Sequence, residues 1–349
     1  MLRKPQDNRI VAFDALRIIA AFAVIVTHIA AQRFYLDSYP SVEWTVRNFY
    51  HSLCRWDVPV FVMISGALFL DVSREVKIKK LYTQNIFRII TVFLFWSIVY
   101  VLYDGLGNKG FISVLERIIQ CHFHLWFLKM LIGLYVAVPI LRVIVSNKKI
   151  EQYFIGIALL TAYLYPMCIQ IMGYLNDTGK YLLALSYSGL DFHIASGYVG
   201  YFLLGHYVHT YEMKKSYIRG IYALGVLSIF TVFILTQYAS DTIGGPYTGF
   251  YEYLNVFTMF ETVSIFLFVK NIHFAPKYCS VLRNISNASL GIYLIHALVM
   301  QIECDYFGIG NSPLMPALLI PCDALLTFVV SYVIIEILIR IPVVNKIIM

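Results

Sequence analysis

Long apolar stretches separated by short polar segments make up most of this chain. A helix needs about 20 mostly apolar residues to cross a bilayer. Ten stretches meet this requirement, at residues 10–31, 50–70, 84–103, 125–145, 152–173, 192–211, 216–238, 250–271, 286–303 and 317–339. The pattern predicts an all-α, polytopic membrane protein of about ten transmembrane helices, with residues 1–349 forming a single membrane-embedded domain.

The amino-acid composition supports the prediction of a membrane protein and gives no indication of a nucleic-acid partner. Of the 349 residues, 60% are hydrophobic and 13% are charged, whereas soluble domains carry about 25% charged residues. The net charge of +7 does not indicate a nucleic-acid partner, because the basic residues form short clusters between apolar stretches. The six cysteines show no CxxC or CxxH spacing and are expected to be apolar fillers. A disulfide bond between Cys304 and Cys322, outside the membrane, is the alternative for these two cysteines.

Lysine and arginine set the expected orientation. With the N-terminus in the cytoplasm, 19 of the 27 Lys and Arg residues lie at cytoplasmic helix ends or in cytoplasmic loops. Five lie in outer loops, and Arg17, Arg55 and Lys129 lie within spans. This imbalance follows the positive-inside rule, so we expect both termini in the cytoplasm. The first apolar stretch is long enough to span and lacks a cleavage site, so we expect it to be retained.

Two ionisable residues interrupt the first apolar stretch. Arg17 and His28 are eleven positions apart, which on a helix is three turns plus roughly 20°, so both lie on one face, about 16 Å apart along the axis. The expected orientation places Arg17 in the cytoplasmic half and His28 in the outer half. Ionisable groups inside a membrane commonly mark function. The alternatives are an Arg17 that snorkels or pairs with Asp14, and a His28 that bonds a backbone carbonyl.

Other spans supply further candidate site residues, namely Asp57, Arg88, His124, Trp126, Glu261 and His296. Each also has a structural interpretation. Arg88 fits a positive-inside anchor, and Glu261 fits an ion pair with Lys129 or an arginine. His296 fits a hydrogen-bonded histidine of the helix bundle.

His124 and Trp126 precede or begin the fourth span and fit either an interface anchor or the rim of a substrate cavity. Asp57 is expected just inside the outer end of the second span. The sequence contains no GxSxG, HExxH, P-loop or GxGxxG motif. Ser65, beside a glycine in the second span, is better explained by helix packing than by nucleophilic catalysis.

Four segments in order resemble the acyltransferase-3 family of integral membrane acyltransferases. The family's opening, with an arginine and a histidine separated by ten residues, is similar to FDALRIIAAFAVIVTHIA. Its second span is similar to VPVFVMISGALF, its fourth to HLWFLKMLIGLYVAVPIL and its penultimate helix to SLGIYLIHALV. The resemblance covers nearly the whole chain. Within the family, the chain is most similar to bacterial enzymes that O-acetylate surface polysaccharides or their lipid-linked precursors.

This resemblance implies an enzyme of the bacterial cytoplasmic membrane that transfers an acyl group, most commonly acetyl, from cytoplasmic acetyl-CoA to a sugar hydroxyl. No metal is expected. The resemblance implies that His28 is catalytic and that Arg17 is essential nearby. Asp57, His124, Trp126, Glu261 and His296 then become candidate substrate-binding residues.

The expected donor site is cytoplasmic and is assigned to Arg17, Arg88 and Lys80. The family often carries two arginines three residues apart at the start of the third span. Here Asn85 stands at the first position and Arg88 at the second. Lys80 or its neighbour Lys79 can replace the missing arginine only as a point charge, without the planar fork of a guanidinium.

The thioester donor is already activated, whereas the acceptor alcohol is a poor nucleophile. The protein therefore has to supply a base. A neutral histidine suits this task, since its ordinary pKa lies near 6.5, and we expect His28 to take the hydroxyl proton. A covalent acyl group on His28 or Ser65 is the competing mechanism.

A transporter or flippase for sugars or lipid-linked sugars is the alternative from another class. The two halves of the chain show no hydropathy symmetry and no paired broken helices, which transporters commonly have. A third alternative, a subunit whose acyltransferase site has decayed, conflicts with the retained Arg17, His28 and His296.

Overall fold

The protein is described by a computed structural model that covers residues 10–105, 110–175, 177–188, 197–309 and 316–342. Every regular element in these ranges is helical. The elements are α1 (Val11–Gln32), α2 (Val42–Cys54), α3 (Asp57–Phe69), α4 (Ile78–Lys80), η1 (Leu81–Ile86), α5 (Phe87–Tyr103), α6 (Phe111–Gln120), η2 (Phe123–Leu125), α7 (Trp126–Val145), α8 (Lys148–Ala158), η3 (Leu159–Leu164), α9 (Tyr165–Leu175), α10 (Asp177–Ser188), α11 (Tyr198–Thr210), α12 (Lys215–Ile243), η5 (Gly249–Tyr251), α13 (Val256–Lys270), α14 (Pro276–Phe307) and α15 (Pro316–Ile339).

Nine helical segments in the described ranges are long and apolar enough to cross a membrane. They match nine of the predicted spans and confirm an all-α, polytopic membrane protein. The remaining predicted span, 192–211, begins outside the described residues and contains α11 in its described part. The count of ten spans and the orientation of the termini therefore stay predictions.

Several spans are longer than the hydropathy pattern predicts, because their ends carry polar residues. The second span runs from Val42 to Phe69, and its start is set by Ser41, whose hydroxyl accepts a hydrogen bond from Trp44 N at 3.1 Å. The ninth span, Pro276–Phe307, begins with a proline and ends before Gly308, which adopts the left-handed conformation common after helices.

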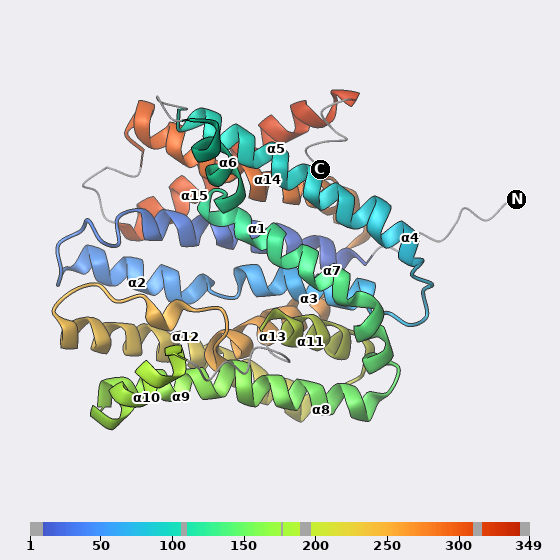
Figure 1. The fold of residues 1–349 in the computed structure, drawn as a ribbon, viewed down its shortest axis with the longest axis horizontal. Coiled ribbons are helices and arrows are strands. Elements are labelled where there is room, and N and C mark those ends of the chain that lie inside the picture. The colour runs from blue at the N-terminus through green and yellow to red at the C-terminus, as the bar shows by residue number, and fades with distance from the viewer. Residues whose placement is uncertain (1–9, 106–109, 176, 189–196, 310–315, 343–349) are drawn as a thin grey trace, which may run out of the picture.

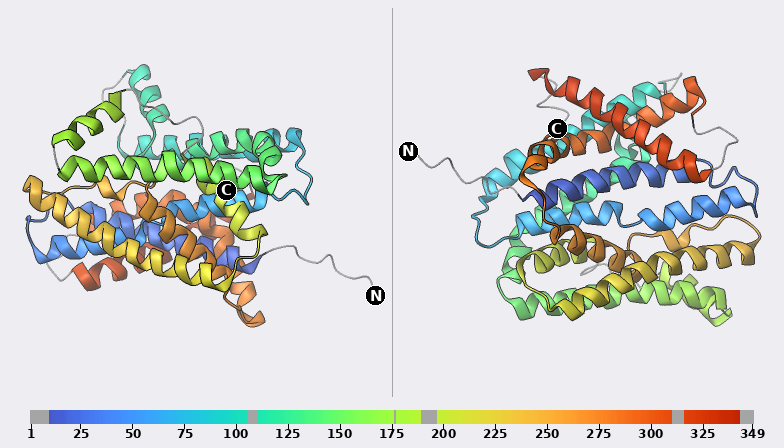
Figure 2. Two further views of the ribbon diagram at one scale, coloured as in Figure 1. Left: turned by 90° about the horizontal axis from the view of Figure 1, so that it is seen from below. Right: turned by 180° about the vertical axis from the view of Figure 1, so that it is seen from behind.

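Helix α1 lies in the middle of the bundle. It packs against α14 and α15 on one side and against α2 and α3 on the other (Figure 1). The same order of layers is visible from behind, with α11, α12 and α13 beyond α3 (Figure 2). Small side chains allow this close enclosure, since Ala20, Ala21 and Ala30 of α1 are almost completely buried.

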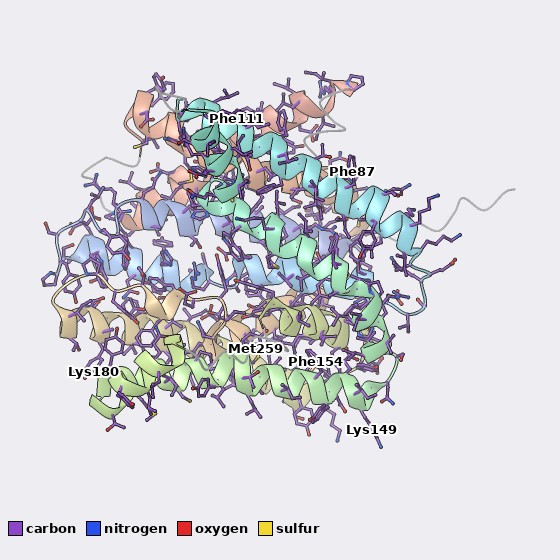
Figure 3. All side chains as sticks on the ribbon, viewed as in Figure 1. Phe87, Phe111, Lys149, Phe154, Lys180 and Met259 are labelled. Atoms are coloured by element: carbon purple, nitrogen blue, oxygen red, sulfur yellow. The ribbon has the colours of Figure 1, made fainter. Side chains whose placement is uncertain are left out.

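The outward-facing surfaces of the bundle are apolar, as lipid contact requires. Phe87 on α5 is 65% exposed and Phe111 on α6 is 81% exposed. In Figure 3 these two side chains lie on the outer side of the bundle, and Lys149 and Lys180 mark opposite ends of the α8–α10 layer. The six cysteines carry free thiols, so the Cys304–Cys322 bridge is not formed.

Helices α3 and α11 cross at two glycines that face each other's backbone. A Cβ atom added to Gly66 of α3 would lie 1.8 Å from the Phe202 carbonyl oxygen of α11. One added to Gly205 of α11 would lie 2.0 Å from the Met63 carbonyl oxygen of α3. Neither backbone can move aside as a flexible side chain could, so the two helices need glycine at both positions.

We expect Gly66→Ala and Gly205→Ala each to lower the melting temperature of the purified protein, because overpacking costs about 1–3 kcal/mol or more. Gly133→Ala is the matched control, since an added Cβ on this exposed glycine of α7 has no neighbouring atom within 4 Å. Thermal unfolding in detergent measures all three variants. Equal melting temperatures for Gly66→Ala and Gly133→Ala would contradict the close crossing.

Candidate active site

A cavity of about 420 Å³ lies beside the Gln32 end of α1. Helix α1, the turn before α7 and helix α14 enclose it. Its lining residues are His28, Ala31, Gln32, His122, Phe123, Ala297, Met300, Gln301, Cys304 and Asp305. The cavity therefore combines apolar and aromatic surface with two imidazoles, two amides and a carboxylate.

Histidine rings gather around His28. The His28 ring stacks on His296 of α14 with centroids 5.2 Å apart and an interplanar angle of 18°. Phe123 meets the His28 ring edge-on at 5.0 Å. The His296 ring in turn lies 5.1 Å from His124. The structure thus brings together His28, His124 and His296, three residues selected from separate spans of the sequence.

Hydrogen bonds define which nitrogen of each histidine ring carries the proton. Nε2 of His124 lies 3.2 Å from the Leu294 carbonyl oxygen, which can only accept, so Nε2 donates. The two Nδ1 atoms of His122 and His124 are 2.9 Å apart, so in the neutral rings His122 donates and its Nε2 keeps a lone pair. Burial lowers the pKa of His122, which favours the neutral ring at pH 7.

The same reasoning applies to His296. Its Nδ1 lies 2.5 Å from the Tyr293 carbonyl oxygen and donates to it. Its Nε2 is buried and has no hydrogen-bond partner among the described residues. The stacked ring of His296 therefore holds the His28 ring from one side while keeping an acceptor atom available.

A second polar cluster lies where α2 ends and α3 begins. Asp57 is the first residue of α3 and is buried. One carboxylate oxygen accepts from Thr27 Oγ1 of α1 at 3.0 Å, and the other accepts from Val58 N at 2.6 Å. Asp57 therefore lies in the interior of the Val42–Phe69 span rather than near its outer end, because this span begins earlier than predicted.

Arg55 occupies the break between α2 and α3. Its Cζ atom lies 4.0 Å from the centre of the Tyr253 ring. The charges of Arg55 and Asp57 both act on the buried carboxyl group of Glu261. Both carboxylate oxygens of Glu261 lack a hydrogen-bond partner among the described residues, so the expected ion pair of Glu261 with an arginine stays a prediction. Lys129 is not that partner, since its Nζ donates to the Gln120 carbonyl oxygen at 3.4 Å.

Trp126 belongs to this second cluster rather than to the histidine cluster. Its ring lies 5.4 Å from Tyr198 and 5.8 Å from Tyr253. Trp126, Tyr198 and Tyr253 are each partly exposed. They form an aromatic wall beside Arg55, contributed by the starts of α7 and α11 and by the segment before α13.

The residues assigned to the donor lie toward the other end of α1. Arg17 pairs with Asp14 at 3.5 Å, and Asp14 also accepts from Ser286 at 2.8 Å. The charges of Arg17 and Arg88 both act on the hydroxyl of Tyr135. Both arginines therefore lie within electrostatic range of Tyr135, and their assignment to one donor site stays a prediction.

The positions of Lys80 and Ser65 give little support to a role in donor binding or in catalysis. Lys80 ends the short helix α4 and is exposed, and among the described residues it makes no hydrogen bond or ion pair with Arg17 or Arg88. Ser65 lies beside Tyr135 of α7, which fits a packing role. About 16 Å of helix separate Arg17 from His28, so these two residues of α1 do not lie in the same cluster of side chains.

Sequence reasoning missed Arg55, His122 and Tyr253. Arg55 is an ionisable residue within a span, which is the same sequence signal that selects Asp57 and Glu261. This signal could have identified it. His122 lies in the polar segment before α7 and becomes a cavity residue only through the turn at η2. No pattern in the sequence pairs Tyr253 with an arginine almost 200 positions away.

Comparison with known families identifies the fold. A family described as "Acyltransferase domain" (acyltransferase-3) matches residues 10–336. The match spans most of the chain, so the chain belongs to the acyltransferase-3 family and is a membrane acyltransferase. Searches of curated proteins and of solved structures returned no match.

Proposed function

We propose that the protein transfers an acyl group, most simply acetyl, from cytoplasmic acyl-CoA to a sugar hydroxyl on the outer side of the membrane, with His28 as the base. One observation carries this proposal. In a member of the acyltransferase-3 family, His28 lines a cavity at one end of α1, while Arg17, selected for the donor, pairs with Asp14 toward the other end.

The lining of the cavity supports a sugar as the acceptor. Its volume of about 420 Å³ falls in the range of small-ligand pockets and suits a saccharide unit. Gln32, Gln301 and Asp305 offer amide and carboxylate groups for hydroxyls, and the Phe123 ring offers an apolar face. The acceptor is proposed to be a surface polysaccharide or its lipid-linked precursor.

His28 supplies the base that the reaction needs. The neutral imidazole takes the proton of the sugar hydroxyl while the oxygen attacks the thioester carbonyl carbon. The tetrahedral intermediate then collapses, the carbon–sulfur bond breaks, and the imidazolium returns the proton to the leaving thiolate. The stacked His296 ring and the Phe123 edge limit rotation of the His28 ring, which keeps the base oriented.

The donor must bridge the length of α1. Arg17 and Arg88 are proposed to bind phosphates of the CoA, since guanidinium groups match phosphate geometry. The pantetheine arm then extends along α1 toward His28. This route follows the buried face shared by Arg17 and His28, and it makes direct transfer possible without an acyl-enzyme.

The positive-inside imbalance supports a plasma-membrane location with both termini in the cytoplasm. This orientation places the Arg17 end of α1 next to cytoplasmic acyl-CoA and opens the His28 cavity toward the outer leaflet. The bacterial cytoplasmic membrane is the proposed location.

We expect His28→Ala to abolish acylation, because general-base catalysis contributes about 10²- to 10⁴-fold to a rate. Cells lacking the gene are complemented with the wild type, with His28→Ala or with His273→Ala, an exposed histidine as control. Mass analysis of surface glycans reports the acyl mass and its acceptor. Restored acylation by His28→Ala, at equal protein abundance, would refute the proposed role.

We expect Arg17→Ala to weaken acetyl-CoA binding by about 10- to 100-fold, the size of one charge-assisted hydrogen bond. Arg219→Ala is the control, because Arg219 is exposed on α12. Equilibrium binding of labelled acetyl-CoA to purified protein measures the effect, and a melting curve checks that loss of the Asp14 pair leaves the fold intact. Unchanged affinity would exclude Arg17 from the donor site.

A further inference from the structure

Arg55 is a buried arginine whose Nε–H makes no hydrogen bond within the part of the chain that the structure describes. The residue is 8% exposed. Its Nε atom has no hydrogen-bond partner among the described residues. A guanidinium carries five N–H donors, and an unmet buried donor costs about 1–3 kcal/mol or more for a charged group. Such a group at membrane depth indicates a ligand.

The neighbouring carboxyl groups of Asp57 and Glu261 do not occupy the donors of Arg55 among the described residues. The two oxygens of Asp57 accept from Thr27 and from Val58 N. The two oxygens of Glu261 have no hydrogen-bond partner among the described residues. Neither Asp57 nor Glu261 therefore forms a closed ion pair with Arg55 among the described residues.

Tyr253 fixes the plane of the guanidinium. Its ring faces Cζ of Arg55 at 4.0 Å, a cation–π arrangement. Stacking uses the flat face of the guanidinium and leaves the N–H groups at its edge, where they can point to a partner. The arginine is thus preorganised for an acceptor oxygen.

Arg55 lies within electrostatic reach of His28. Its charge acts on His28 and on His51. A hydrogen bond also links the two sites, because Thr27, which precedes His28, donates to Asp57 at 3.0 Å. The α2–α3 break therefore faces the same part of α1 that carries the proposed base.

The proposed reaction needs a donor at this place. When the sugar oxygen bonds to the thioester carbon, the electron pair of the C=O double bond moves onto the carbonyl oxygen. His28 has accepted the hydroxyl proton and cannot also stabilise this charge. Arg17 is about 16 Å away along α1.

We propose that Arg55 is a catalytic residue that donates hydrogen bonds to the carbonyl oxygen of the acyl group during transfer. This inference rests on the proposed function. Arg55 keeps its protons throughout. The oxyanion forms, the C=O bond is restored, the carbon–sulfur bond breaks, and the proton held by His28 passes to the thiolate. In a water-poor site such a donor acts at full strength.

The test uses Arg55→Gln and Arg55→Lys in proteoliposomes, with labelled acetyl-CoA and a glycan extract from cells lacking the gene. We expect Arg55→Gln to lower kcat about 10²- to 10³-fold, with the KM for acetyl-CoA and for the extract changed by less than about threefold. Arg55→Lys, which keeps the charge but loses the fork, should fall between.

A second readout separates catalysis from a structural role. Fluoroacetyl-CoA forms a more stable oxyanion, so the loss of kcat in Arg55→Gln should be smaller with this donor than with acetyl-CoA. Arg47→Gln is the matched control, because Arg47 is a buried arginine whose donors are used by Asp37 and by the Ile29 carbonyl oxygen. We expect Arg47→Gln to lower the melting temperature and to leave kcat within about threefold of the wild type.

Three outcomes would overturn the inference. An unchanged kcat in Arg55→Gln excludes a role in the chemical step. A raised KM for the extract with unchanged kcat assigns Arg55 to an anionic group of the acceptor instead. An equal loss with both donors makes Arg55 structural. If the wild type itself transfers no acyl group, the proposed function fails, whereas a dead His28→Ala beside an active Arg55→Gln rejects only the role of Arg55.

Discussion

The cost of burying charge in an apolar bundle is the constraint on which this structure depends. A charged side chain at membrane depth costs about 2.5–3.5 kcal/mol or more unless partners compensate it. Some buried groups are compensated within the protein, as Arg47 is by Asp37 and by the Ile29 carbonyl oxygen. Arg55 and Glu261 keep buried polar atoms without hydrogen-bond partners among the described residues. Such incomplete pairing beside His28 is what a site that receives polar substrate atoms requires.

Helix α1 connects the two ends of the proposed reaction. Its small buried residues let α2, α3, α14 and α15 surround it, so the face of α1 between Arg17 and His28 is shielded from lipid. Thr27 ties this helix to the α2–α3 break through Asp57. The proposed base and the proposed donor-binding Arg17 thus share one rigid helix, and Asp57 ties the segment that carries Arg55 to it, which limits errors in their relative positions.

The spans could be predicted from the sequence because lipid contact requires about 20 apolar residues in a row, but their ends could not. Val42–Phe69 begins at a polar cap, and this shift moved Asp57 from the expected outer end to the interior. The residue types of the candidate site were largely predictable, since Asp57, Glu261 and His296 are costly in a span. Their partners were not, because Thr27 meets Asp57 and His124 meets His296 only through packing of separate helices.

Sidedness tests the central claim most directly, that a thioester from one face of the membrane reaches a base at the other. The protein is reconstituted in one orientation, which protease removal of an N-terminal tag verifies, with the glycan extract confined to the face opposite that tag. We predict that labelled acetyl-CoA supplied only on the face of the N-terminus yields acetylated glycan, and that His28→Ala yields none. Acetylation that requires acetyl-CoA on the same face as the glycan would contradict the account.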